Sequence, residues 1–268
     1  MNHLPLLLTL FGLVVCSPSA AESDAAADEV ALLRQVFSRQ VSDRWVEEPY
    51  ALLVYADAYA QLTDIEAASG CLEPQYGAYV DRNTKRQLIV VFFFDAASRT
   101  IVPIGWDHVS TGNPKRSGHF VTPCGVFTNA VTSVGYRALG TKNAKGWRGL
   151  GEKGSRVWDF GWQWTEHYVR KQRDDRQIRL LLHATDPVQG ESRLGRPDSK
   201  GCVRISAKLN AFLDRFGILD ADFEAAGETF AWLLHPDRQP VSHAGRYLIV
   251  GDSTRQPVRQ LVAQASTP

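Results

Sequence analysis

The chain has 268 residues, of which 44% are hydrophobic and 22% are charged, and its formal net charge is +1. This is the composition of a globular protein, and the length suits one large domain or one domain with a sizeable extension. The balanced charge gives no sign of a nucleic-acid or strongly acidic partner, so neither is expected.

Residues 1–21 have the pattern of a secretory signal peptide. An apolar run from Leu4 to Val15 is too short to span a bilayer, and the small residues at 19–21 offer a cleavage site. We therefore predict export with cleavage, although no Lys or Arg precedes the run. An uncleaved anchor is the alternative, and a lipid on Cys16 is disfavoured because no small residue directly precedes it.

The four cysteines are Cys16, Cys71, Cys124 and Cys202. Signal cleavage would remove the first and leave three. In an oxidising compartment two of these can pair and one is left over. The sequence alone does not identify the odd thiol.

Residues 22–70 are predicted to be helical. Apolar residues fall on one face of a helical period in the first part, at Val30, Leu33, Val36, Phe37 and Val41. A second helical segment starts near residue 51 and stops at residue 70, which is a glycine.

The pattern changes to β-type near Lys85. Continuous apolar or β-branched runs predict strands at 86–95 and 100–111, and another strand that ends near His183. Later strands are predicted over 228–236 and 245–253. Between them, Ser206 is placed to cap a helix whose apolar face includes Leu209, Phe212 and Leu213 and which Gly217 would end.

Residues 135–179 are predicted to form a long excursion with partial helix or hairpin content. The segment is rich in Lys and Arg and contains four tryptophans, Trp147, Trp158, Trp162 and Trp164. One interpretation is a lid that grips glycan or peptide and excludes water. The other, which we favour because tryptophan is usually largely buried, is a small core of an inserted subdomain.

The stretch SKGCVRIS, residues 199–206, suggests a nucleophile at Cys202. Such chemistry needs a base, for which His183 is available at the end of a predicted strand, and donors for an oxyanion. Gly201 would let backbone amides approach the reacting group, and the helix start near Ser206 would favour a thiolate. Arg204 would bind a substrate carboxylate or order the loop. The alternative is a buried structural cysteine.

These residues resemble the signature of the L,D-transpeptidase catalytic domain. The resemblance rests on His183 followed by the pattern of Ser199, Gly201, Cys202 and Arg204, and on the upstream stretch HVSTGNPKRSGHFVTPCGVF. It covers roughly Lys85 to Leu234.

The resemblance implies a periplasmic or cell-wall enzyme that acts on peptidoglycan stem peptides as donor and acceptor. Cys202 would attack a diaminopimelate carbonyl of a tetrapeptide, release D-Ala and pass the acyl group to an amine, giving 3,3 or 1,3 cross-links. His183 would be the base. The resemblance further assigns oxyanion or supporting roles to Ser199, Lys200 and Gly201, and substrate binding to Arg204 and His119. It also implies a possible carbapenem or other β-lactam adduct on Cys202.

The chain departs from the family pattern at two positions. Lys200 stands where many members carry His, and Ala184 stands where Gly is frequent; Thr185 or Asp186 can still form a local turn there. Cys124 occupies the variable position of the upstream turn, so the resemblance makes it structural, either paired with Cys71 or reduced.

Other histidines are expected to be structural or exposed. His119 is either a cleft residue or a surface-loop residue, His108 is expected to be a strand residue, and no motif includes His167, His235 or His243. No metal or other cofactor is expected, because His183 and Cys202 are two ligands where zinc takes three or four.

The predicted fold is α+β, with a β-rich L,D-transpeptidase-like core and a helical N-terminal extension. Its parts are a signal peptide at 1–21, a helical segment at 22–84, a catalytic domain at 85–252 and a flexible tail at 253–268. Two other functions remain open: hydrolysis at the same site, as an L,D-carboxypeptidase or an amidase that releases wall-attached protein, or a non-catalytic wall-binding module.

Overall fold

The computed structural model describes residues 20–70, 72–170 and 172–254. Most of the predicted signal peptide and most of the predicted tail lie outside these ranges. Two N-terminal helices, α1 (Ala20–Gln40) and α2 (Glu48–Ser69), precede a mixed α+β fold. The elements that follow are β1 (Gln75–Asp81), β2 (Leu88–Asp95), β3 (Thr100–His108), β4 (His119–Phe120), β5 (Gly125–Thr128), β6 (Tyr136–Arg137), β7 (Arg156–Val169), β8 (Gln172–Ala184), η1 (Glu191–Arg193), β9 (Val203–Ile205), α3 (Ala207–Arg215), α4 (Ala221–Ala225), η2 (Gly227–Phe230) and β10 (Tyr247–Gly251).

The first sheet has the strand order β3-β2-β1-β10-β5 and is buried on both faces. In β2, Ile89, Val91 and Phe93 belong to one core cluster, and the alternating residues belong to another. Side chains of a strand alternate between faces, so a strand covered on both sides needs apolar residues throughout. This explains the unbroken apolar run in β2.

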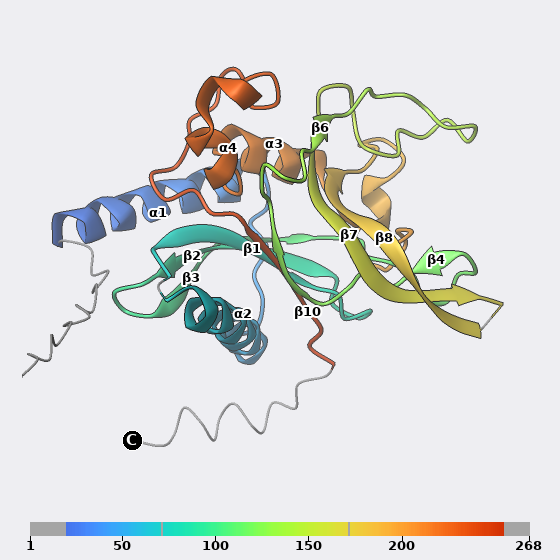
Figure 1. The fold of residues 1–268 in the computed structure, drawn as a ribbon, viewed down its shortest axis with the longest axis horizontal. Coiled ribbons are helices and arrows are strands. Elements are labelled where there is room, and N and C mark those ends of the chain that lie inside the picture. The colour runs from blue at the N-terminus through green and yellow to red at the C-terminus, as the bar shows by residue number, and fades with distance from the viewer. Residues whose placement is uncertain (1–19, 71, 171, 255–268) are drawn as a thin grey trace, which may run out of the picture.

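Helix α2 covers one face of this sheet, and α1 and α3 cover the other (Figure 1). The buried stripe of α2 follows a four-residue spacing at Tyr50, Val54, Ala58 and Leu62. On the opposite face, the ring of Phe37 from α1 occupies the space that a side chain would need at Gly105. The N-terminal helices are therefore integral layers of the fold.

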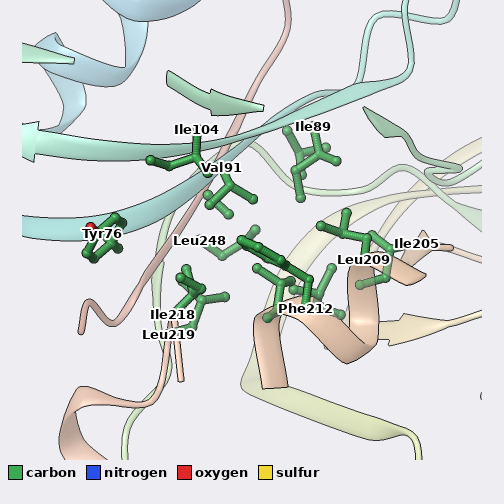
Figure 2. Close-up of a cluster of buried hydrophobic side chains, with 14 of the residues drawn as sticks. Tyr76, Ile89, Val91, Ile104, Ile205, Leu209, Phe212, Ile218, Leu219 and Leu248 are labelled. Carbon is green, nitrogen blue, oxygen red and sulfur yellow. The ribbon is translucent and has the colours of Figure 1, made fainter. Parts of the chain in front are cut away.

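The main core lies between the first sheet and α3 (Figure 2). Figure 2 shows Phe212 of α3 directed toward Val91 and Leu248 of the first sheet. Ile205, at the end of β9, joins the same cluster and is fully buried. The segment that follows Cys202 is consequently fixed by packing on the core.

The second sheet has the order β4-β7-β8-β9, with β6 also paired to β7. Its long strands β7 and β8 form an antiparallel hairpin, which Figure 1 shows extending away from the helices. The short strand β9 pairs with β8 in parallel. Parallel strands cannot be joined by a tight turn, so the chain between β8 and β9 must cross from the end of one strand to the start of the other. That crossing consists of loops and the helical turn η1.

Several predicted elements are confirmed. Both N-terminal helices, the strands β2, β3, β8 and β10, and the helix capped by Ser206 are present. The Ser206 hydroxyl accepts a hydrogen bond from the backbone N–H of Leu209 at 3.1 Å. The helix ends at Arg215, with Gly217 two residues later in a left-handed conformation.

Two predictions need correction. The segment 22–84 was predicted to be helical, yet it contains β1, which pairs with β2 and β10 at the centre of the first sheet. The strand predicted over 228–236 is instead the helical turn η2 and a loop, because Leu233 and Leu234 are buried against Phe223 in a small separate cluster.

The predicted excursion 135–179 contains the expected hairpin, and its described residues form no helix. Neither interpretation of its tryptophans fits all four. Trp158 is fully buried in the main core and Trp147 is half-buried, whereas Trp162 and Trp164 are exposed.

Among the residues described, no helix combines the length and the apolar character that a membrane span requires.

Candidate active site

The loop that carries Cys202 runs from the buried residues Asp198 and Ser199 to the start of β9. Ser199 is fully buried; its hydroxyl donates to the Cys202 carbonyl at 2.6 Å and accepts from the Gly201 N–H at 3.0 Å. The Thr122 hydroxyl donates to the Gly201 carbonyl at 2.7 Å. These bonds fix the backbone on both sides of the cysteine, so Ser199 orders the Cys202 loop.

Gly201 is required by its backbone conformation and by close packing. Its φ is +133°, a value that L side chains rarely adopt, and a Cβ there would lie 2.4 Å from Ile178 Cδ1 and 2.9 Å from Phe120 Cβ. Its N–H is directed at Ser199 within the loop. The oxyanion role predicted for this amide would therefore need the loop to rearrange.

The Cys202 thiol is half-buried beside β8. Its Sγ lies 3.8 Å from the Arg179 carbonyl oxygen, to which the thiol can donate a weak hydrogen bond. Burial raises the pKa of Cys202 above its ordinary value, and the charge of Arg204 acts in the opposite direction. The resting group is thus a thiol, and a nucleophilic role requires a base to remove its proton.

His183 is a buried base near the end of β8. Its Nδ1 lies 2.7 Å from the Ala184 carbonyl oxygen, which can only accept, so Nδ1 carries the proton and Nε2 has the free lone pair. Burial lowers the pKa of His183 to about 4, so the ring is neutral at neutral pH. A neutral imidazole can accept a proton from a neighbouring thiol.

Strand register pairs His183 with Arg204, and Cys202 directly precedes β9; continued along the chain, the alternation of that strand puts the cysteine on the same face of the second sheet as His183. Residues two apart share a face, and strand spacings put such diagonal positions roughly 8 Å apart at Cα. The intervening Val203 and the neighbouring Leu182 are fully buried on the opposite face, in the main core.

Two further residues on this face were missed by the sequence analysis. Tyr136 of β6 pairs with Val157, which pairs with His183, so the three form one row across the sheet. The charges of Asp159 and Cys202 both raise the pKa of Tyr136, after burial as the first cause. Asp159 is fully buried and forms an ion pair with Arg179 at 2.5 Å. No short-range motif identifies either residue, since only the pairing of β6, β7 and β8 brings them together.

Arg204 is held by a carboxylate that the sequence analysis also did not single out. Asp198 is almost fully buried and forms ion pairs with three guanidinium groups, at 3.0 Å to Arg116, 2.6 Å to Arg193 and 3.5 Å to Arg204. One carboxylate among three cations leaves a local excess of positive charge. Arg204 is thus ordered beside the thiol, and the site favours an anionic group.

Lys200 adds a further cation to this region, and His119 lies next to it as a neutral side chain. His119 Nδ1 lies 2.8 Å from the Ser199 carbonyl oxygen, which places this histidine against the Cys202 loop. Burial is the main reason why the pKa of His119 lies below its ordinary value. The positive charges of Arg116, Lys200 and Arg204 lower it further. Lys200 is exposed, and its carbonyl accepts from the Phe120 N–H at 3.1 Å. Of the two positions expected for His119, in the cleft or in a surface loop, the contact with the Cys202 loop favours the first.

The turn after His183 is held by Asp186. A local turn held by Thr185 or Asp186 was predicted there, where Ala184 follows the histidine. The Asp186 carboxylate accepts from the backbone N–H groups of Val188, Gln189 and Arg148, and these bonds lower the pKa of Asp186 to about 2. The bond from Arg148 anchors the loop before β7 next to the end of β8. A cavity of about 540 Å³ lies in that loop and reaches Tyr136.

The helix start predicted to assist the thiol lies elsewhere. β9 separates Cys202 from α3, and three strand residues rise about 10 Å. The dipole effect of a helix falls off within its first turn, so it does not reach the thiol.

In the part of the chain that the structure describes, no cluster of three or more His, Cys, Asp or Glu side chains is able to hold a metal ion. Cys71 lies outside the described residues, so the Cys71–Cys124 pairing stays a prediction; Cys124 itself is exposed. His108 ends β3 as expected, and His167 is buried against Phe120.

Comparison with protein-family models and with curated proteins found no match for this chain.

Proposed function

We propose that this protein is an exported cysteine acyltransferase of the L,D-transpeptidase type, with a β-rich core of that family, acting on peptidoglycan stem peptides in the periplasm or cell wall. The observation that carries the proposal is the pairing of His183 with Arg204, two residues after Cys202, which brings a neutral buried imidazole and a half-buried thiol to one end of the second sheet. The resemblance of the surrounding sequence to that family selects the substrate.

In the proposed first step, His183 Nε2 takes the thiol proton as Cys202 Sγ bonds to a diaminopimelate carbonyl carbon. The tetrahedral intermediate then collapses, the peptide bond to D-Ala breaks, and the imidazolium returns the proton to the departing amine. In the second step an acceptor amine attacks the thioester, its proton passes to His183 and then to the thiolate. No oxidant, metal or other cofactor enters this balance.

The excess positive charge beside the thiol supports a peptide substrate that ends in a carboxylate. Arg204 is ordered by Asp198, and Lys200 is exposed next to the cysteine. We assign to Arg204 the orientation of a stem-peptide carboxylate, with Lys200 contributing charge to the same region and neutral His119 available as a hydrogen-bonding group.

The direct test is incubation of the purified chain with disaccharide-tetrapeptide under reducing conditions, followed by mass spectrometry of the intact and digested protein. The proposal expects loss of D-Ala and an acyl mass on the peptide that contains Cys202, not on the peptide that contains Cys124. A carbapenem should add its mass at the same residue. Absence of both adducts would contradict the proposal.

The same experiment separates the alternative functions. Cross-linked dimers indicate transfer to an amine, and free tripeptide indicates hydrolysis by the same acyl-enzyme. A protein that binds wall material equally well with and without Cys202, and forms no adduct, would be a non-catalytic binding module.

A further inference from the structure

The sheet face that carries the thiol continues along the β7–β8 hairpin as an aromatic surface. Trp162 and Trp164 lie two residues apart on β7, so they share a face. Trp162 pairs with Arg179, whose carbonyl oxygen is the atom 3.8 Å from Cys202 Sγ. The aromatic surface therefore begins at a direct neighbour of the thiol.

Both tryptophans are unusually exposed for their type. Trp162 is 64% exposed and Trp164 is 66% exposed, whereas Trp158, on the core face of the same strand, is fully buried. The fold thus has a buried position for a tryptophan on β7 and still keeps two others in solvent. Neighbouring exposed aromatic side chains mark binding surfaces, because leaving them in water has no structural benefit.

The charged residues around these tryptophans neutralise one another. Arg179 is ion-paired with Asp159, and Arg173 lies 3.8 Å from Glu166 and 3.4 Å from Asp175. A polyanion or an anionic membrane would need unpaired cations here. A neutral ligand that is rich in hydroxyl and amide groups instead finds both hydrogen-bond donors and acceptors.

A groove continues from the second tryptophan. It has a volume of about 490 Å³ and is lined in part by Arg82, Trp164, Glu166, Arg173 and Asp175. Flat indole faces beside a polar groove suit a sugar, whose C–H face stacks on an aromatic ring while its hydroxyl groups bond to the rim. The spacing of about 7 Å between alternate strand residues is comparable with one sugar unit.

We propose that Trp162, Trp164 and this groove bind the N-acetylhexosamine glycan strand that bears the stem peptides. The choice of that polymer rests on the proposed function. A glycan seated on the hairpin would run away from the thiol, so that a stem peptide branching from it reaches Cys202. The excursion, for which a lid that grips glycan or peptide was the alternative interpretation, would then act as a glycan platform.

The test measures binding of glycan strands stripped of stem peptides to the full chain, by calorimetry and by tryptophan fluorescence. The double variant Trp162→Ala/Trp164→Ala should bind about tenfold more weakly or worse, since each stacked ring contributes separately. The matched controls Trp45→Ala and Trp232→Ala remove tryptophans that are 79% and 62% exposed elsewhere, and should bind within about twofold of the parent. Thermal unfolding verifies that each variant is folded.

Three results would overturn the inference: no binding of stripped glycan by the parent chain, equal binding by the double variant, or an equal loss in the controls. Acylation of Cys202 by a glycan-free tetrapeptide, measured on the parent chain, tests the proposed function separately. Tryptophan-dependent glycan binding without acylation would keep the surface and reject the chemistry. Acylation without glycan binding would support the proposed function and reject glycan binding by this surface.

Discussion

The first sheet, β3-β2-β1-β10-β5, carries buried side chains on both faces, whereas the second sheet, with strand order β4-β7-β8-β9, carries them mainly on one. In the first sheet the two faces pack on helices, and its strands β1 and β2 are almost entirely buried. In the second sheet the core face holds Trp158, Leu182 and Val203, and the other face holds His183, Cys202 and the exposed tryptophans.

This difference in burial shows which sheet face can carry polar and reactive side chains in this fold. A polar side chain on either face of the first sheet would lose its hydration without a partner, which is costly. The second sheet has one face that is partly open to solvent, at Trp162 and Trp164, and the buried polar residues His183 and Asp159 on that face have partners. Polar and reactive groups are placed there and are held from behind by an apolar core, so they are positioned rigidly without being central to stability.

The largest expected effect tests this comparison at the thiol. Cys202→Ala should abolish acyl-enzyme formation completely, because no other group supplies the bond to the substrate. Its unfolding free energy should change little, since Cys202 is outside the core clusters. Intact-mass spectrometry and denaturant unfolding measure the two quantities. Persistent adduct, or a fold lost together with the thiol, would break the comparison.

In the first sheet the expectation is reversed. Phe92 is 1% exposed and packs on Gly77, so Phe92→Ala should lower the unfolding free energy by about 3–5 kcal/mol. Trp162→Ala, on the solvent face of the second sheet, should change it by less than about 0.5 kcal/mol. Urea unfolding followed by circular dichroism compares them. Similar losses in both variants would show that the two sheets contribute alike.

A pH titration probes the buried base. The pKa of His183 is about 4 in the folded protein, below its ordinary value of 6.5. The unfolded chain therefore binds the extra proton first, so this group lowers stability as the pH falls through the window from 6.5 to 4. The full effect is about 3 kcal/mol, at one pKa unit per 1.36 kcal/mol.

The control for that titration is His183→Gln, which should flatten the slope in this window, while His235→Gln, in the loop after η2, should keep it. Acylation should likewise persist in mildly acidic solution and fall only as the pH approaches 4. If the acylation rate instead fell with a midpoint near pH 6.5, His183 would be more hydrated than the structure indicates.

The smallest expected effect concerns Lys200. Its side chain is exposed, and a charge in water contributes about 1 kcal/mol to a neighbour a few ångströms away. Lys200→Ala should therefore slow acylation by less than about tenfold, and added salt should reduce the difference. Single-turnover kinetics at two ionic strengths measure it. A loss equal to that of Cys202→Ala would assign Lys200 a direct role.

Some parts of the candidate site were predictable because their signals are local. The cap at Ser206, the strand ending near His183 and the glycine before Cys202 each follow from a few adjacent residues. Tyr136, Asp159 and Asp198 could not be found in this way. Their roles come from strand pairing and from ion pairs that join residues far apart in the sequence.

The same distinction explains the errors in the fold. β1 lies in a segment of mixed apolar and small residues between α2 and β2, and it is a strand because β2 and β10 pair with it. The run at 228–236 has the apolar content of a strand but no partner strand, so its leucines are buried by helical turns instead.

The sequence by itself determined the two N-terminal helices, the helix capped by Ser206, the apolar strand β2 and the residues able to act as nucleophile and base, because periodicity, capping and side-chain chemistry are local properties. The tertiary structure decided which face of which sheet carries them, that His183 is neutral, and that Arg204 is fixed by Asp198. It also decided that two tryptophans are exposed beside the thiol and one is buried. Burial and cross-strand pairing depend on the whole chain, and no short stretch of residues encodes them.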